Sequence, residues 1–192
     1  ILTYVIYLIA RPVTQLYSTP EKSPITSWAY SILGQIYVVL PLALLGVWGY
    51  KSDYQLFMNT EYLLMALFVF VWTNDTGAYI VGCTLGKHRL FERISPKKSW
   101  EGFFGGLAFC IILASLANYI IPGMLSTAQW IGMGILTSIF STWGDLCESL
   151  LKRTAGVKDS GKILPGHGGI LDRFDSELIA SPVIFIYLTF VL

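Results

Sequence analysis

The sequence predicts an all-α membrane protein that crosses the bilayer several times. Hydrophobic residues make up 54% of the 192 residues and charged residues only 13%, whereas about a quarter of the residues in a soluble domain are charged. The mean hydropathy is +0.61. The chain is therefore too apolar for a disordered protein, and it has too few charges to cover the surface of a soluble domain of this length.

Uncharged runs locate the expected helices, because about 20 apolar residues cross a hydrocarbon core about 30 Å thick. The uncharged run 102–144 is too long for one crossing, and the helix-breaking Pro122 and Gly123 divide it. The sequence thus predicts about six transmembrane helices, two of them truncated. They are expected at residues 28–50, 62–86, 102–121 and 127–150, with truncated crossings at 1–10 and 178–192.

Basic residues are distributed unequally between the two sides that alternating crossings define. One side holds twelve of the thirteen Lys and Arg residues, and the other side holds Lys51 alone. Basic loops remain in the cytoplasm according to the positive-inside rule. We therefore predict that the cytoplasmic loops are 11–27, 87–101 and 151–176, and that 51–61 and 122–126 face the opposite side.

Most of the charged residues lie in two segments of the chain. Nineteen of the 25 charges fall between Asp75 and Glu101 or between Asp145 and Glu177. The net charge of +1 provides no basic field, so nucleic acid is not an expected partner. The three cysteines, Cys83, Cys110 and Cys147, have no CxxC spacing and are interpreted as reduced, buried packing residues. We therefore expect the functional residues in the two charged segments.

Two pairs of acidic residues flank the second charged segment. Asp145 and Glu148 are three residues apart at the end of one predicted helix, and Asp172 and Asp175 repeat this spacing at the start of the next. Each pair can therefore share a helix face. Together the pairs suit Mg²⁺, which takes carboxylate and phosphate oxygens. The alternative is a solvated loop whose charges form salt bridges with one another, and the pattern leaves both interpretations open.

Glycines are concentrated in the segment between these acidic pairs. The turn Gly166-His-Gly-Gly169 permits positive φ angles and lets backbone amides approach a phosphate closely. An ordinary tight turn is an equally good interpretation. Residues 156–162 match the start of a P-loop, but Ile163 stands where Ser or Thr should hold the metal. We therefore reject a P-loop.

Asp75 lies near the middle of the predicted crossing 62–86. A charged side chain at that depth costs about 2.5–3.5 kcal/mol on insertion scales, so it is a functional candidate by default. The alternative is a structural aspartate that is either protonated or paired with a neighbouring helix. Lys97 and Lys98 follow just before the next crossing, where they either bind an anionic substrate or serve only as topology signals.

The run from Ser149 to Asp175, S-x-x-K-R-x4-K-D-x5-P-G-H-G-G-x-x-D-R-x-D, resembles the signature of phosphatidate cytidylyltransferases, also called CDP-diacylglycerol synthases. The upstream segments N-D-T-G-A-Y and S-P-K-K-S-W-E-G also resemble that family, although Ser99 stands where Thr is more usual. We therefore expect N-terminally truncated spans of generic character at 1–70. A catalytic membrane domain is expected at 71–192, with the signature at 149–175.

The resemblance implies a reaction in which CMP is transferred from CTP to phosphatidate, giving CDP-diacylglycerol and pyrophosphate with the help of Mg²⁺. It implies in-line attack by a phosphatidate oxygen on the α-phosphorus of CTP. The expected partners are CTP, phosphatidate and the lipid bilayer, and a homodimer is left open. The expected location is the inner membrane of a bacterial cell, with the active site facing the cytoplasm.

The resemblance also implies roles for individual residues. The expected catalytic residues are Asp145, Asp172, Asp175, Lys152, Arg153 and Arg173. Of these, the three aspartates are expected to hold Mg²⁺, while a second cation and a contribution from Asp75 are left open. The expected substrate-binding residues are Lys87, Ser95, Lys97, Lys98, Lys158, Asp159, Lys162, His167, Gly168 and Gly169.

Two other functions remain open. A CTP-dependent lipid-alcohol kinase would use a similar basic loop and metal site, but it would transfer the γ-phosphate instead of CMP. An ion-coupled transporter would explain Asp75 as a coupling-ion site. The transporter leaves the glycine-rich segment unexplained.

Overall fold

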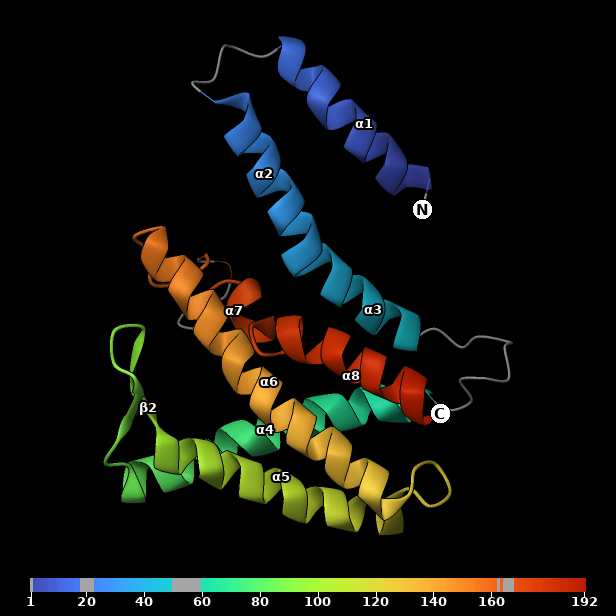
Figure 1. Cartoon of the computed structure of the whole chain (residues 1–192), viewed down its shortest axis with the longest axis vertical. Helices are drawn as coiled ribbons and strands as arrows, with labels where there is room; N and C mark the ends of the chain where they lie inside the picture. Colours follow the sequence, from blue (N-terminus) through green and yellow to red (C-terminus); the bar gives the residue numbers. More distant parts are fainter. Residues whose placement is uncertain (1, 18–22, 50–59, 162, 164–167) are drawn as a thin grey trace. The chain divides into compact units, whose positions relative to one another are not determined.

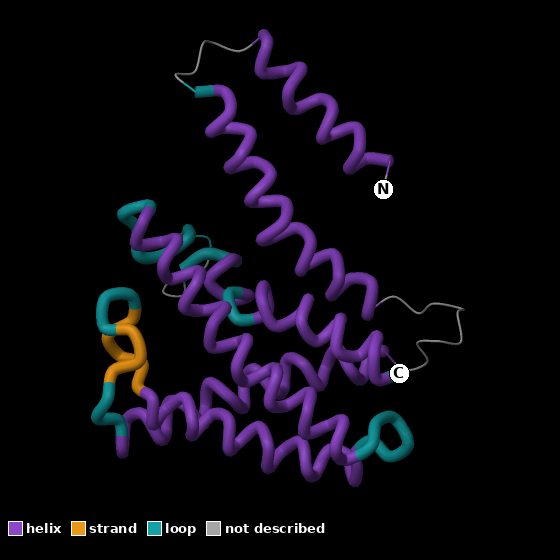
Figure 2. Tube along the Cα trace, viewed as in Figure 1, coloured by secondary structure: helices purple, strands orange, loops and turns teal. Residues whose placement is uncertain are grey.

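The protein is described by a computed structural model that covers residues 2–17, 23–49, 60–161, 163 and 168–192, and most of these residues are helical (Figure 2). The chain divides into two compact units, Ile1–Leu40 and Pro41–Leu192. The elements are α1 (Leu2–Tyr17), α2 (Pro24–Gly34), the π-helix η1 (Gln35–Val39), α3 (Leu40–Gly49), α4 (Thr60–Leu85), β1 (Arg89–Phe91), β2 (Ser95–Ser99), α5 (Trp100–Ile120), α6 (Thr127–Thr154), α7 (Leu171–Phe174) and α8 (Glu177–Val191).

The all-α membrane class predicted from the sequence is confirmed. Within the described parts of the chain, four helical segments are long and apolar enough to cross a membrane. They are Pro24–Gly46, Glu61–Leu85, Trp100–Ile120 and Leu171–Val191. Helices α1 and α6 occupy the other two predicted positions, so every predicted crossing coincides with helix, and four of the six meet the length and hydropathy criteria.

The first unit contains α1 and α2, which are joined by polar contacts. The Arg11 guanidinium donates hydrogen bonds to Ser27 Oγ (2.7 Å), Ser31 Oγ (3.3 Å) and Gln15 Oε1 (2.6 Å). Ser23 caps the N-terminus of α2, with Pro24 at its first turn. Neutral oxygens thus satisfy three of the guanidinium donors within an otherwise apolar helix pair.

The second unit is built on α4, α5, α6 and α8, which pack around a common core. The buried apolar side chains of this core are Leu45, Leu63, Leu67, Phe70, Val71, Cys110, Ala114, Ala117, Leu125, Trp130, Met133, Ala180, Ile184 and Leu188. Of the three cysteines predicted to be buried only Cys110 is, because Cys83 and Cys147 lie on outer faces of their helices. The predicted break at Pro122 and Gly123 is confirmed, since Gly123 has a φ of +80° and the next helix begins at Thr127. Ser126 and Gln129 form a capping box that starts α6 there.

A β-hairpin replaces the plain loop expected at 87–101. Strands β1 and β2 pair antiparallel, and Glu101, in the first turn of α5, holds the start of the hairpin. Its Oε2 accepts hydrogen bonds from the backbone N–H groups of Lys87 (3.1 Å) and His88 (3.2 Å), and its Oε1 lies 2.6 Å from His88 Nδ1. The hairpin therefore has a fixed attachment to α5.

The two charged segments lie at the same end of the second unit, as the alternating crossings predict. In Figure 1 the hairpin and the C-terminal end of α6 lie at one end of this unit, and the turn before α6 and the chain's C-terminus lie at the other. An ion pair between Lys98 of β2 and Asp145 of α6 joins the two segments at the first end. The two charged segments therefore meet at this end of the unit through Lys98 and Asp145.

Candidate active site

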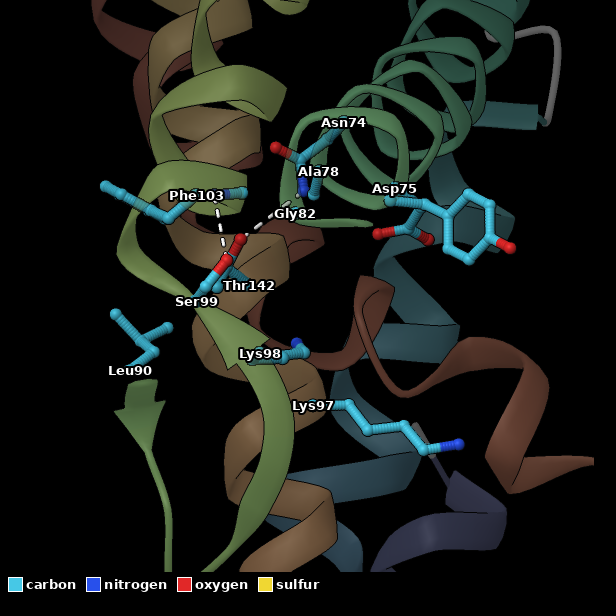
Figure 3. A pocket seen from close by; sticks show the side chains of 12 residues that line it. Asn74, Asp75, Ala78, Gly82, Leu90, Lys97, Lys98, Ser99, Phe103 and Thr142 are labelled. Atoms are coloured by element: carbon cyan, nitrogen blue, oxygen red, sulfur yellow. Dashed lines mark hydrogen bonds between the residues drawn. The ribbon is translucent and has the colours of Figure 1, made fainter. Parts of the chain in front are cut away.

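A cavity of about 230 Å³ lies between α4, β2, α5 and α6, at the end of the unit that carries the charges. It is lined by Asn74, Asp75, Ala78, Tyr79, Gly82, Leu90, Lys97, Lys98, Ser99, Gly102, Phe103 and Thr142. Figure 3 shows the carboxylate of Asp75 from α4 and the side chains of Lys97 and Lys98 from β2 at this cavity. The structure therefore unites Asp75 with the two lysines, which the sequence placed in separate motifs.

Lys98 forms an ion pair within a group of carboxylates. Its Nζ lies 2.5 Å from Asp145 Oδ2. Asp75 interacts electrostatically with Lys98, Asp145 and Asp175, so carboxylates from α4, α6 and the segment between α7 and α8 lie within electrostatic range of one another. Three carboxylates leave a net negative charge beside Lys98, and this arrangement suits a bound cation next to an anionic substrate.

Gly144 allows Asp175 to approach Asp145. A Cβ atom at Gly144 would lie 2.7 Å from the carbonyl oxygen of Asp175 and 2.8 Å from that of Ser176, which is too close for any side chain. The absence of a side chain lets the segment between α7 and α8 lie directly against α6. Asp175 is held there by Ser176, whose backbone N–H donates to its Oδ1 at 2.6 Å.

Asp172 organises the loop between α6 and α7. Its carboxylate accepts hydrogen bonds from the Ser160 N–H (2.9 Å), the Ser160 hydroxyl (2.8 Å) and the Gly169 N–H (2.7 Å). Lys152 Nζ of α6 lies 2.7 Å from the other carboxylate oxygen. Four donors from three parts of the chain thus converge on one carboxylate, and such charge-assisted bonds are stronger than neutral ones.

Gly168 of the predicted turn is required by this arrangement. Gly168 has a φ of +81°, a backbone conformation that side chains with a Cβ atom rarely adopt. A Cβ atom there would also lie 2.6 Å from Asp172 Oδ2. The turn therefore uses the freedom of glycine at Gly168, and the Gly169 amide donates to Asp172 Oδ2.

Lys152 bridges two carboxylates on the buried side of this loop. Its Nζ lies 2.8 Å from Glu148 Oε2 and 2.7 Å from Asp172 Oδ1, and the Glu148 side chain is only 1% exposed. Burial disfavours the charged form of Lys152 and lowers its pKa. The hydrogen bonds to Asp172 and Glu148 outweigh this effect, so the pKa of Lys152 lies above its ordinary value. Lys152 therefore remains charged and joins the end of α6 to the loop.

Replacing Lys152 by methionine is expected to destabilise the protein by about 3–5 kcal/mol, because Glu148 would be left buried without a counter-charge. Replacing both Lys152 by methionine and Glu148 by leucine should recover most of this loss. Denaturant unfolding in detergent measures both effects, with Arg89→Met as an exposed control that leaves stability unchanged. Equal destabilisation by the single and double replacements would contradict the buried ion pair.

The carboxylates suit a magnesium ion that is completed by substrate. Among the residues that the structure describes, no group of three His, Cys, Asp or Glu side chains is arranged to hold a metal ion. Mg²⁺ usually binds through one or two protein carboxylates together with water and substrate phosphates, so a closed protein cage is not required. Asp145, which pairs with the cavity lysine Lys98 and accepts a hydrogen bond from Ser149, is one such carboxylate. Asp175, whose Oδ1 accepts from Ser176, is a second, whereas four protein donors already converge on Asp172.

The other predicted site residues fall outside this cluster. The exposed ones are Lys87, Arg153, Lys158, Asp159 and Arg173, and Ser95 is partly buried in β2. Arg153 donates to the Val157 carbonyl at 3.4 Å, which holds it against the end of α6. Lys162 and His167 lie outside the described residues.

Sequence reasoning missed a polar stripe on α6. Ser138, Ser141, Thr142 and Glu148 are buried and Asp145 is partly buried, and their spacing of three or four residues puts them on one face of the helix. This stripe is the physical reason why α6 is less apolar than its neighbours. The signal was available in the sequence as polar residues at helical spacing inside a predicted crossing. Its partner Asn74, from α4, was not predicted.

The fold and this site define a polytopic helical membrane protein with an acidic, lysine-containing cavity at one end of its helices. The chain belongs to the cytidylyltransferase family, whose family model matches residues 1–191. It is 41% identical over 160 residues to the phosphatidate cytidylyltransferase of Staphylococcus aureus (strain COL), an alignment that covers 83% of this chain and 61% of that protein.

Two further relatives carry the same name. The phosphatidate cytidylyltransferase of Staphylococcus haemolyticus (strain JCSC1435) is 41% identical over 159 residues, and that of Staphylococcus epidermidis (strain ATCC 12228) is 40% identical over 159 residues. In both cases the alignment covers 83% of this chain and 61% of the relative. The chain thus spans about three fifths of the length of these curated relatives.

Proposed function

We propose that this protein transfers CMP from CTP to phosphatidate, giving CDP-diacylglycerol and pyrophosphate. The observation that carries the proposal is that Asp75 and Lys98 line one cavity of an apolar helical unit, with Asp145 paired to Lys98 and Asp175 within electrostatic range of Asp75. A lipid phosphate can reach such a cavity from the bilayer, and a nucleoside triphosphate can reach it from water. Membership of the cytidylyltransferase family and the names of the relatives support the same reaction.

The proposed chemistry is an in-line displacement at phosphorus. An oxygen of the phosphatidate phosphate attacks the α-phosphorus of CTP, a new P–O bond forms, and the bond to the β-phosphate breaks so that pyrophosphate leaves. A phosphate monoester has a second pKa of about 6, so near neutral pH it is already mostly a dianion. The reaction therefore needs no obligatory general base. We expect His167 instead to position the turn or to donate a hydrogen bond to a phosphate oxygen.

Within this mechanism the protein supplies position and charge. Lys97 and Lys98 neutralise phosphate oxygens at the cavity, and the ion pair with Asp145 holds Lys98 in place. Asp145 and Asp175 would hold Mg²⁺, with Asp172 nearby as the organiser of the loop. When bound, Mg²⁺ supplies charge neutralisation for the triphosphate and for the leaving pyrophosphate.

Product analysis tests the proposed reaction. The purified protein is incubated with Mg²⁺, with either phosphatidate or a lipid alcohol, and with CTP labelled at the α- or at the γ-phosphate, and the lipids are analysed by mass and by label. We expect CDP-diacylglycerol that carries the α-label. Transfer of the γ-label to a lipid alcohol would instead establish the kinase, and absence of any CTP turnover would contradict both enzymes.

We also propose that the charged end of the second unit faces the cytoplasm of a bacterial cell at its inner membrane. Labelling of single cysteines tests this topology. Each cysteine is introduced at Phe91, Val157 or Ala128 in a protein from which Cys83, Cys110 and Cys147 have been removed. An impermeant thiol reagent applied to intact spheroplasts should label Ala128→Cys only, and it should label the other two only after lysis. Labelling of Phe91→Cys and Ala128→Cys from the same side would contradict this topology.

A further inference from the structure

Asn74 is a buried polar side chain that joins α4 to α6. It is 1% exposed, and its Oδ1 accepts a hydrogen bond from Ser138 Oγ at 2.6 Å. Its Nδ2 donates to Ser141 Oγ at 3.2 Å and to Thr142 Oγ1 at 3.3 Å. One carboxamide therefore contacts three hydroxyl groups of the neighbouring helix, and Figure 3 shows the contact with Thr142 at the wall of the cavity.

Helix α5 confines the same carboxamide from another direction. A Cβ atom at Gly106 would lie 2.5 Å from Asn74 Oδ1 and 2.7 Å from the Asn74 carbonyl oxygen. The backbone of α5 thus passes directly against Asn74 because Gly106 has no side chain. Contacts from two helices therefore hold the carboxamide in one orientation.

The hydroxyl groups that contact Asn74 share a helix face with Asp145. Ser138, Ser141 and Thr142 precede Asp145 by seven, four and three residues, the intervals at which residues on one face of a helix recur. On α4, Asn74 directly precedes Asp75. The contact between Asn74 and α6 therefore lies one residue from Asp75 on α4 and about one helical turn from Asp145 on α6.

We propose that Asn74 is a positioning residue for the acidic cluster, an inference that rests on the proposed function for its kinetic part. Apolar packing is non-directional and leaves the rotation of α4 against α6 weakly specified. Hydrogen bonds are directional, so those of Asn74 fix that rotation. Asn74 acts through Asp75 and Asp145 and does not itself take part in the chemistry.

The kinetic prediction compares Asn74→Leu, which keeps the side-chain size, with Thr137→Val as a matched control. Thr137 is a buried hydroxyl of α6 for which no hydrogen-bond partner is found in the described structure. In Asn74→Leu we expect kcat per folded molecule to fall about 10- to 100-fold, since misplacement by about 1 Å costs as much as 100-fold. Half-saturating Mg²⁺ should rise as well. Thr137→Val should change neither value.

Folding should tolerate the Asn74→Leu replacement. Ser141 Oγ and Thr142 Oγ1 also donate to the Ser138 carbonyl, at 3.2 and 3.0 Å, so they keep partners within α6. A purely structural role would lower the amount of active protein at unchanged half-saturating Mg²⁺. Ser138→Ala should reproduce part of the kcat loss, and combining it with Asn74→Leu should add little, because both remove the same contact.

A distance measurement decides the inference independently of activity. Spin labels at Trp72 of α4 and Trp143 of α6, both exposed, report the separation of the two helices in a cysteine-free background. Asn74→Leu should shift or broaden the distance distribution, and Thr137→Val should not. An unchanged distribution, or a changed distribution with normal kcat, would overturn the inference. Lack of CTP turnover by the wild type would refute the proposed function, and the distances would still test the helix contact.

Discussion

Replacing Asp145 by asparagine is expected to lower CTP-dependent turnover by about 10²- to 10³-fold, comparable to the loss of one preorganised electrostatic group, while the protein still purifies in folded form. Asp145 Oδ2 lies 2.5 Å from Lys98 Nζ, and Asp145 is also one of the two carboxylates proposed for Mg²⁺. The asparagine keeps the size of the side chain but loses the charge that holds Lys98 and attracts the cation.

An exchange of the two charges separates the functional role of Asp145 from a purely structural one. The double variant Lys98→Asp with Asp145→Lys restores an ion pair between β2 and α6. It should therefore recover the thermal stability lost in either single variant, but not the turnover, because the lysine and the carboxylate would face the wrong partners. Glu92→Gln, in the exposed hairpin turn, is the matched control. Recovery of turnover in the exchanged protein would show that the pair is only structural.

Helix positions were predictable because a membrane imposes a simple length and hydropathy rule. The predicted crossing 102–121 differs from α5 by two residues at its start and one at its end, and 62–86 differs from the Glu61–Leu85 segment by one residue at each end. The turn at Pro122 and Gly123 was also predictable from residue type. These features depend on local sequence alone.

The hairpin and the buried polar contacts were not predictable in the same way. Strands β1 and β2 are only three and five residues long, and their position depends on Glu101, which lies in the next helix. In the sequence Asn74 is an ordinary polar residue. Its role depends on a contact with Ser138, which lies 64 residues later in the chain. Contacts of this kind depend on how helices pack, and one sequence does not specify that pairing.

The charged residues at the end of α6 and in the loop that follows it differ in burial. Glu148 and Lys152 are spaced four residues apart, which indicates a helical ion pair. The sequence did not indicate that this pair is buried, or that Asp172 joins it. The expected catalytic role of Lys152 therefore does not follow from its charge alone, since two carboxylates already engage its ammonium group.

Replacing Asp172 by asparagine is expected to have the largest effect, a loss of turnover of more than about 10³-fold, exceeding the loss of a single electrostatic group. The Asp172 carboxylate accepts from Ser160 and Gly169 and pairs with Lys152. Asparagine provides one acceptor oxygen and directs an NH₂ group at donors. Each lost bond to a charged group costs about 1.5–3 kcal/mol, so the loop should detach from α6.

Hydrogen exchange measures this detachment directly, because the amides of Ser160 and Gly169 both donate to Asp172. In the Asp172→Asn variant both amides should exchange faster, while amides in the middle of α5 should remain protected. The Asp145→Asn variant should instead lose turnover with the loop amides still protected, since Asp145 accepts no bond from the loop in the described structure. Near-normal turnover or unchanged protection at Ser160 and Gly169 in Asp172→Asn would show that other contacts hold the loop, and Asp172 would lose its role as organiser.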